Sequence, residues 1–372
     1  MSNPPARPPR HIGFLDPIRV LLVLLVIAHH TSITYGGSGD WYYREAGSPE
    51  WLKTLLSVFT GTNQAFFMGF FFLIAGYFTP ASLARKGTAG FLRERAWRLG
   101  VPVLVFAALL SPLTRALAAG ARGEDFLPAL WHALGQLRFD PGPLWFNIAL
   151  LMLSAPWVFI ARRLPPVASP RMGLHAAIAL AVLGCGALAF ALRLAMPVGR
   201  SFFHMQIGYF ASYLLLFYGG GWMAGQHFLE RVEWAHARRW VWLAVAVYPV
   251  LWLSAAFAGA FDGDTWRGGW HLPALIYAFW EPFIAAGVIL GSLALFRRYL
   301  PQPGRAWRRL ADASFAAFVI HPPLVVASSW LVQPLSSAPL MRFVLAAPLA
   351  GLMAFGLADT WRRHLAPRQQ DT

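Results

Sequence analysis

Apolar segments of about 20 residues recur along this chain, and their length and number restrict what it can fold into. A helix needs about 20 mostly apolar residues to cross the hydrocarbon core of a bilayer, and such a helix satisfies its own backbone hydrogen bonds. Ten segments come near this length: 14–36, 57–83, 99–119, 142–161, 174–196, 207–228, 240–260, 272–296, 311–333 and 341–361. We therefore expect an all-α, polytopic membrane protein with about ten transmembrane helices.

The charged residues support this fold class and predict an orientation. They make up 13% of the chain, whereas a soluble domain has about 25%. The formal net charge of +15 could indicate a nucleic-acid partner. With ten spans, however, 21 of the 31 lysine and arginine residues fall on one side, which is the bias of cytoplasmic loops. We expect both termini in the cytoplasm, the lipid bilayer as a partner, and no nucleic acid.

The segments between the spans are too short for an independent core, so one domain is expected. We place a cytoplasmic tail at 1–13, the ten-helix domain at 14–361 and a second cytoplasmic tail at 362–372. The first span contains Asp16 and two histidines, which argues against a cleaved signal peptide. Cys185 is the only cysteine, which excludes an intrachain disulfide and a cysteine-based metal site. We expect no bound metal.

The first span carries an arginine and a histidine that both cost free energy in a bilayer and are therefore candidates for function. Arg19 and His30 are eleven residues apart, which is about 16 Å along a helix and close to three turns, so both point the same way. His29 is rotated from His30 by about 100°. We predict that His30 acts as a base and that Arg19 lies nearer the cytoplasm. The alternative is a buried histidine that only hydrogen-bonds a neighbouring helix.

A second pair of arginines lies at the cytoplasmic end of the third predicted span. Arg95 and Arg98 are three residues apart, so they share a helix face. Two guanidinium groups at this spacing suit the oxygen atoms of phosphate groups. Basic residues at span ends are also common without any ligand, so the spacing alone leaves both interpretations open.

Several polar residues lie within the later spans, namely Glu281, Asp312, His321 and Asp359. A lone carboxylate in a membrane is expected to have a partner. Two prolines follow His321 and should break the helix there and free backbone carbonyl groups, as in the lining of a cavity. We predict that Glu281, His321 and Asp312 line a channel; hydrogen bonding between helices is the alternative for each.

These residues fall in motifs that together resemble the acyltransferase 3 family of integral-membrane acyltransferases, nearest its periplasmic-glucan succinyltransferase branch. The motifs are FLDPIR at 14–19 with His30, FFLIAGYF at 71–78, RAWRLGVP at 95–102, LWF at 144–146 and SFAAFVIHP at 314–322. Ala75 stands where the family has a serine, which puts a role for that hydroxyl in doubt. The resemblance follows the order of the chain over nearly its whole length.

The resemblance implies a ten-helix enzyme in a bacterial inner membrane. Such an enzyme moves an acyl group, acetyl or succinyl, from cytoplasmic acyl-CoA to a hydroxyl of an extracytoplasmic glycan or glycolipid. It implies that His30 and Arg19 are catalytic and that Arg95 and Arg98 bind acyl-CoA. Acyl-CoA is a co-substrate, and no permanently bound cofactor is expected. Neither a direct nor an acyl-enzyme mechanism is favoured.

Two other classes fit parts of the pattern. A transporter or lipid flippase also has broken helices and midplane charges, and a membrane scaffold needs no chemistry at all. The ordered arginine and histidine pairs favour an enzyme. Recognition of the acceptor is expected in the outer loops, where Trp41, Tyr42, Tyr43, Asp262 and Asp264 lie.

Overall fold

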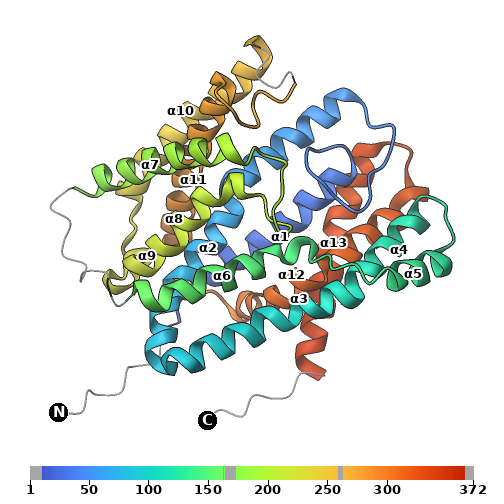
Figure 1. Ribbon diagram of the computed structural model, residues 1–372, viewed down its shortest axis with the longest axis horizontal. Helices are drawn as coiled ribbons and strands as arrows, with labels where there is room; N and C mark the ends of the chain where they lie inside the picture. The colour runs from blue at the N-terminus through green and yellow to red at the C-terminus, as the bar shows by residue number, and fades with distance from the viewer. Residues whose placement is uncertain (1–10, 162, 164–172, 259–262, 365–372) are drawn as a thin grey trace. The chain divides into compact units, whose positions relative to one another are not determined.

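The computed structural model describes residues 11–161, 163, 173–258 and 263–364. In this part of the chain the regular secondary structure is helical, and its only β feature is an isolated bridge between Phe202 and Met205 (Figure 1). The expected all-α fold class is therefore confirmed. Most of the tails predicted at 1–13 and 362–372 lies outside the described residues.

The α-helices are, in chain order, α1 (Leu15–Thr34), α2 (Glu50–Arg95), α3 (Val101–Val105), α4 (Ser111–Ala121), α5 (Phe126–Gly135), α6 (Trp145–Ile160), α7 (Leu174–Ala195), α8 (Phe210–Met223), α9 (Phe228–Arg231), α10 (Trp234–Ala258), α11 (Leu272–Tyr299), α12 (Arg305–Val332) and α13 (Pro339–His364). Two π-helical segments, η1 (Ala96–Gly100) and η2 (Phe106–Leu110), join α2 to α3 and α3 to α4.

Within the described residues, eight helical segments are long and apolar enough to cross a membrane. One of them, Glu50–Ala121, contains two of the ten predicted spans, and its helix is interrupted at Gly87, where φ is 66° and ψ is 173°. Another predicted span, 207–228, forms the 14-residue helix α8, which is shorter than a full crossing. The polytopic membrane fold is thus observed, while the count of ten remains a prediction.

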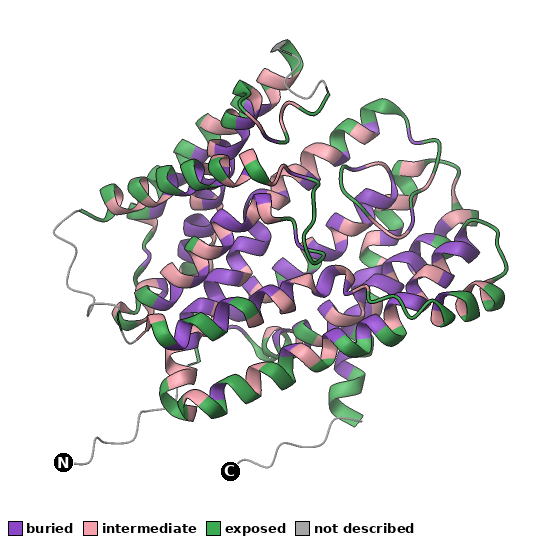
Figure 2. Cartoon of the chain, in the orientation of Figure 1, coloured by how far each residue is buried: buried purple, intermediate pink, exposed green. Residues whose placement is uncertain are grey.

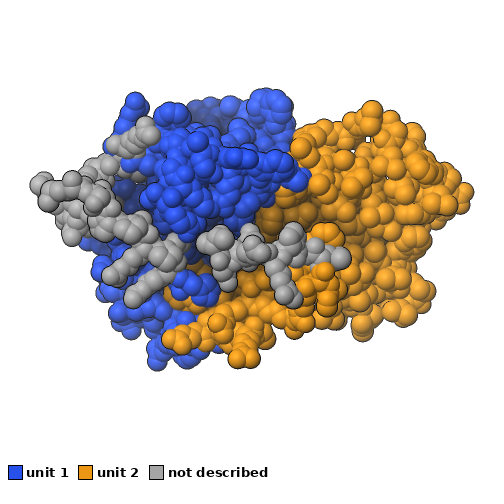
Figure 3. All heavy atoms as spheres, turned by 90° about the horizontal axis from the view of Figure 1, so that it is seen from below, with its two compact units in different colours: residues 1–12, 65–101, 145–301 blue, residues 13–64, 102–144, 302–372 orange. Residues whose placement is uncertain are grey.

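The chain divides into two compact units built from alternating segments (Figure 3). Unit 1 comprises Met1–Ile12, Ala65–Val101 and Trp145–Pro301, and unit 2 comprises Gly13–Gln64, Pro102–Leu144 and Gln302–Thr372. Each unit is described by itself below.

In unit 2, α12 packs against α1, α4 and α13. Four alanines of α13 are buried at four-residue intervals, namely Ala346, Ala350, Ala354 and Ala358. Residues four apart lie on one face of a helix, and small side chains let two helix backbones approach closely in a membrane. This stripe explains how α13 packs closely within the unit.

In unit 1, α11 packs against α7 and α10, and α7 packs against α8. A glycine allows α2 to meet α8, because a Cβ atom on Gly76 would lie 2.0 Å from the carbonyl oxygen of Phe217. Figure 2 shows that α7 is mostly exposed or half-buried. Its exposed residues include Leu180, Leu183 and Leu188, as expected for a helix face in contact with lipid.

Candidate active site

Three aromatic rings of unit 2 come together near the end of α1. His30 lies in the last turns of α1, Trp41 in the segment that follows it, and His321 in the middle of α12. The ring centroid of His30 is 4.0 Å from that of Trp41 and 5.3 Å from that of His321, with interplanar angles of 17° and 19°. The Trp41 and His321 rings are 6.1 Å apart at 13°. We call these three residues the stacked cluster.

Each member of the stacked cluster has a buried nitrogen atom without a hydrogen-bond partner in the described structure. These atoms are His30 Nδ1, Trp41 Nε1 and His321 Nε2. A buried polar atom left unpaired costs about 1–3 kcal/mol, and such atoms are uncommon in native proteins. Three of them in one cluster are therefore candidates to contact a substrate.

The two adjacent histidines of α1 have different surroundings. His29 is buried and lies edge-on to His30, with centroids 5.4 Å apart at 86°. The ring of His30, in contrast, is parallel to Trp41 and His321. Although three histidines gather here, no three potential ligand side chains in the described residues are arranged to hold a metal ion.

Hydrogen bonds fix the segment that carries Trp41. Tyr42 donates to Asp140 Oδ2 at 3.1 Å, and Ser111 donates to the same oxygen atom at 2.9 Å. Burial, with the Asp140 carboxylate beside it, raises the pKa of Tyr42, so its phenol remains protonated as a donor. Gln333 donates to the hydroxyl of Tyr43 at 2.5 Å. These bonds attach the two residues that follow Trp41 to other parts of unit 2.

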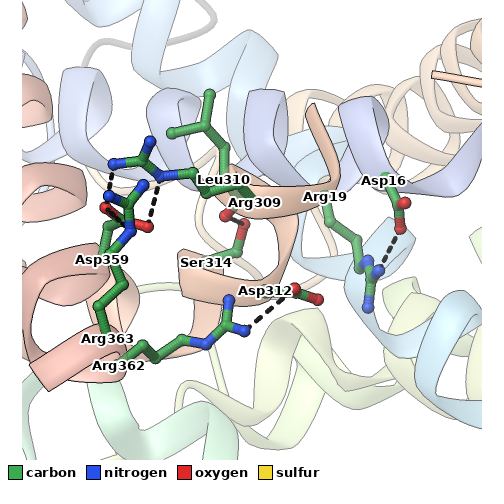
Figure 4. A network of polar contacts seen from close by, with 9 residues as sticks. All are labelled: Asp16, Arg19, Arg309, Leu310, Asp312, Ser314, Asp359, Arg362 and Arg363. Carbon is green, nitrogen blue, oxygen red and sulfur yellow. Dashed lines mark hydrogen bonds and ion pairs between the residues drawn. The ribbon is translucent and has the colours of Figure 1, made fainter. Parts of the chain in front are cut away.

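Arg19 lies at the other end of α1, as its sequence position requires. It forms an ion pair with Asp16 one turn earlier, and Figure 4 shows this contact. The side chain of Asp16 is 2% exposed and that of Arg19 is 38% exposed. This pairing was not predicted, although acidic residues are favoured in the first turn of a helix. Arg19 keeps accessible surface, but its charge is partly compensated.

The two arginines of the second motif belong to unit 1 and differ in their contacts. Arg95 is half-buried, donates to Thr79 Oγ1 at 3.0 Å and lies 5.2 Å from the centroid of the Phe91 ring. Arg98 is 75% exposed and pairs with Glu94 at 3.4 Å. The π-helical segment η1 begins directly after Arg95 and contains Arg98, and such segments are frequent at functional sites.

The intramembrane carboxylate of unit 1 has a basic partner, as expected. Glu281 of α11 forms an ion pair with Arg193 of α7, and their side chains are 8% and 0% exposed. Arg193 also donates to the carbonyl of Gly208 at 3.0 Å and lies 4.6 Å from the centroid of the Tyr277 ring. Arg193 was not predicted as this partner, and its side chain is fully buried.

The carboxylates of α12 and α13 form ion pairs with arginines in unit 2 (Figure 4). Asp312 is 57% exposed and pairs with Arg362 at 3.1 Å. Its predicted position in the lining of a channel stays a prediction, and its side chain is accessible. Asp359 is 6% exposed and accepts hydrogen bonds from Arg309, one of them at 2.7 Å. Arg363 approaches the same carboxylate at 3.2 Å.

The two outer-loop acids predicted near the acceptor belong to unit 1 of the chain. Asp264 pairs with Arg267 at 3.1 Å in unit 1 and is 82% exposed, and Asp262 lies outside the described residues. Asp140 was not among the residues predicted for the site, yet it anchors the segment that carries Trp41. Neither spacing nor composition indicated this contact, because it joins residues 98 positions apart.

A family model described as an acyltransferase domain matches residues 12–359. Glucans biosynthesis protein C of Escherichia coli (strain K12) is 30% identical over 155 residues. The protein of the same name in Salmonella paratyphi B is 38% identical over 158 residues. Both alignments cover 41% of this chain and only 39% of the relative. No solved structure matches the chain.

Proposed function

We propose that this chain, which belongs to the acyltransferase 3 family and is a membrane O-acyltransferase, takes its acyl group from cytoplasmic acyl-CoA. In this proposal the donor is acetyl-CoA or succinyl-CoA and the acceptor is a hydroxyl of an extracytoplasmic glycan. The relatives named for glucan biosynthesis support a glucose-containing acceptor. A bacterial inner membrane, with the donor and the glycan on opposite sides, is the location that this reaction requires.

The stacked cluster is the observation that carries the proposal. Acyl transfer from a thioester to an alcohol needs a base that takes the hydroxyl proton as the oxygen attacks. His30 presents a buried nitrogen without a protein partner beside two further buried nitrogens. A neutral imidazole is the side chain best suited to this step near neutral pH. We assign the proton transfer to His30.

The reaction balances without another reactant. The oxygen atom of the acceptor bonds to the carbonyl carbon, the bond between that carbon and the CoA sulfur breaks, and the proton taken by His30 returns to the thiolate. The products are an ester and free CoA. No covalent intermediate with the protein is needed.

The arginines of unit 1 supply the recognition of the donor in this proposal. CoA carries several phosphate groups, and arginine binds phosphate through charge-assisted hydrogen bonds. Arg98 is exposed and only loosely paired, whereas Arg95 is held by Thr79 and Phe91. The guanidinium group of Arg98 is therefore free to turn toward a phosphate, whereas that of Arg95 is held in one position. Arg19, paired with Asp16, is assigned to guiding the thioester.

The test is acyl transfer by the purified chain in lipid nanodiscs. The donors are radiolabelled acetyl-CoA and succinyl-CoA, and the acceptors are linear glucose oligosaccharides of two to six units. We expect saturable donor binding and a labelled oligosaccharide. A transporter or flippase would neither bind nor cleave acyl-CoA, and that result would overturn the proposal.

A further inference from the structure

His321 has no role in the reaction described so far, although it is the most enclosed member of the stacked cluster. Its side chain is 0% exposed in the middle of α12, and Pro322 and Pro323 follow it directly. The prolines were expected to break the helix, and this expectation was wrong. α12 continues from Arg305 to Val332 with both prolines inside it.

Pro322 leaves one carbonyl group of α12 without its usual donor. In an α-helix the N–H of each residue donates to the carbonyl oxygen four residues earlier, and proline has no N–H. The oxygen atom of Phe318 is therefore not bonded by residue 322. The ring of His321 takes that place, with its Nδ1 atom 2.6 Å from the oxygen atom of Phe318.

This contact defines which nitrogen of His321 carries the proton. A carbonyl oxygen only accepts hydrogen bonds, so Nδ1 must be the donor. In the neutral ring the other nitrogen, Nε2, then has a lone pair and can only accept. His321 Nε2 is buried and has no partner in the described part of the chain.

Two nitrogen atoms of the stacked cluster need hydrogen-bond partners of opposite kinds. His321 Nε2 needs a donor, whereas the indole Nε1 of Trp41 is itself a donor and needs an acceptor. A hydroxyl group does both, because it has one O–H and two lone pairs. The attacking hydroxyl has only one proton, and the proposed function gives that proton to His30. His321 Nε2 and Trp41 Nε1 are therefore left to bind a second hydroxyl.

We propose that His321 and Trp41 form a subsite for a second hydroxyl of the acceptor, next to the one that is acylated. This inference rests on the proposed function, and it names the acceptor as a polyhydroxylated molecule such as a sugar. The second hydroxyl donates to His321 Nε2 and accepts from Trp41 Nε1. His321 thus acts as a substrate-binding residue and His30 as the base, each with its own hydroxyl.

The test measures the coupling between His321 and one acceptor hydroxyl. The acceptors are methyl glucoside and its monodeoxy analogues, and NMR of the product identifies the acylated position. In the wild-type protein, removal of the hydroxyl nearest to that position should lower kcat/KM roughly tenfold to a hundredfold. His321→Phe keeps a ring of similar size and should cause a similar loss. Combining the two changes should cost no more than either alone.

Losses that multiply would show that His321 and this hydroxyl do not interact and would overturn the subsite. Acyl-CoA binding, which the proposed function gives to the arginines of unit 1, should be unchanged in His321→Phe. If the wild-type protein cleaves acyl-CoA but acylates no glucoside, the subsite is wrong while the acyl-CoA chemistry stands. If it neither binds nor cleaves acyl-CoA, the proposed function fails first.

The two prolines provide a matched pair of variants that leaves His321 in place. Pro322→Ala restores an N–H that competes with His321 Nδ1 for the carbonyl of Phe318. The proton of the His321 ring is then no longer fixed on Nδ1. Pro323→Ala restores an N–H opposite Val319, which the ring does not contact. We expect Pro322→Ala to weaken discrimination against the deoxy analogue and Pro323→Ala to preserve it. Equal behaviour of the two variants, both with wild-type melting temperatures, would refute the role of the Phe318 contact.

Discussion

Removing one partner of the buried ion pair in unit 1 should destabilise the protein more than replacing both partners. The side chains of Arg193 and Glu281 are 0% and 8% exposed, so Glu281→Met leaves a guanidinium charge buried and unpaired. Such a change typically costs about 3–5 kcal/mol, whereas replacement of both partners by apolar residues is often neutral. The comparison therefore separates the cost of an unpaired charge from the contribution of the pair.

The contacts of Arg193 set the expected size of the effect in the double variant. Arg193→Met with Glu281→Met also removes the hydrogen bond to Gly208 and the contact with the ring of Tyr277. A hydrogen bond from a charged donor contributes about 1.5–3 kcal/mol and a desolvated cation–π contact about 2 kcal/mol. The desolvation cost of the two buried ions, which the double variant also removes, offsets part of this loss. We expect the double variant to lose about 2 kcal/mol and the single variant Glu281→Met to lose at least about 3 kcal/mol.

The assay is reversible unfolding in mixed micelles at increasing SDS concentration, followed by circular dichroism. A double variant as unstable as Glu281→Met would refute the unpaired-charge argument, because the charge is absent from it. The same proteins also test the predicted role of Glu281 in a channel. A double variant that is stable but inactive in acyl transfer would support that role, whereas full activity would leave the pair a purely structural one.

Three further predictions concern the site and the topology. His30→Ala should lower acyl transfer by about 10²- to 10⁴-fold with unchanged acyl-CoA affinity, and His29→Ala should keep most activity; the reverse order would contradict the assignment of the base. Arg95→Ala and Arg98→Ala should each weaken acyl-CoA binding by roughly tenfold to a hundredfold, as expected for a lost charge-assisted contact. Unchanged affinities in calorimetry would show that the two arginines mark only the cytoplasmic end of the span. Tag accessibility should place the segment 120–140 outside and the C-terminus inside the cell.

The sequence was sufficient for the fold class, because bilayer thickness acts on each segment separately. A helix of suitable length and composition can be recognised without knowing its neighbours. The number of membrane crossings could not be obtained from composition in the same way. The helix α8 is only 14 residues long within the predicted span 207–228, and composition does not show where a helix ends. Gly87, in contrast, interrupts a helical segment at a place where two separate spans were expected.

For the site, the sequence was informative wherever a residue acts through its own helix. Helical geometry favoured His30 over His29 as the base. Of these two rings, that of His30 is the one parallel to the rings of Trp41 and His321. Contacts between distant segments could not be obtained in this way. Asp140 accepts a hydrogen bond from Tyr42, 98 positions away in the sequence, and a local sequence pattern does not predict such a contact.

The sequence also did not show which charged side chains are buried. Arg193 was not singled out from the sequence, and Asp312 was predicted to line a channel. Arg193 is fully buried by its pairing with Glu281, whereas Asp312 is exposed beside Arg362. A charged side chain is buried when a partner on another helix compensates for the lost hydration, and the sequence does not show which helices are neighbours.

The unpaired nitrogen atoms of the stacked cluster link stability to catalysis. Each buried atom without a partner destabilises the free protein by about 1–3 kcal/mol. Stacking of His30 on Trp41 and the anchoring of Tyr42 by Asp140 hold the rings in place despite this cost. An acceptor that satisfies all three nitrogens removes the cost on binding, whereas an alcohol with a single hydroxyl leaves part of it. The same atoms that strain the free site therefore favour a polyhydroxylated acceptor over water.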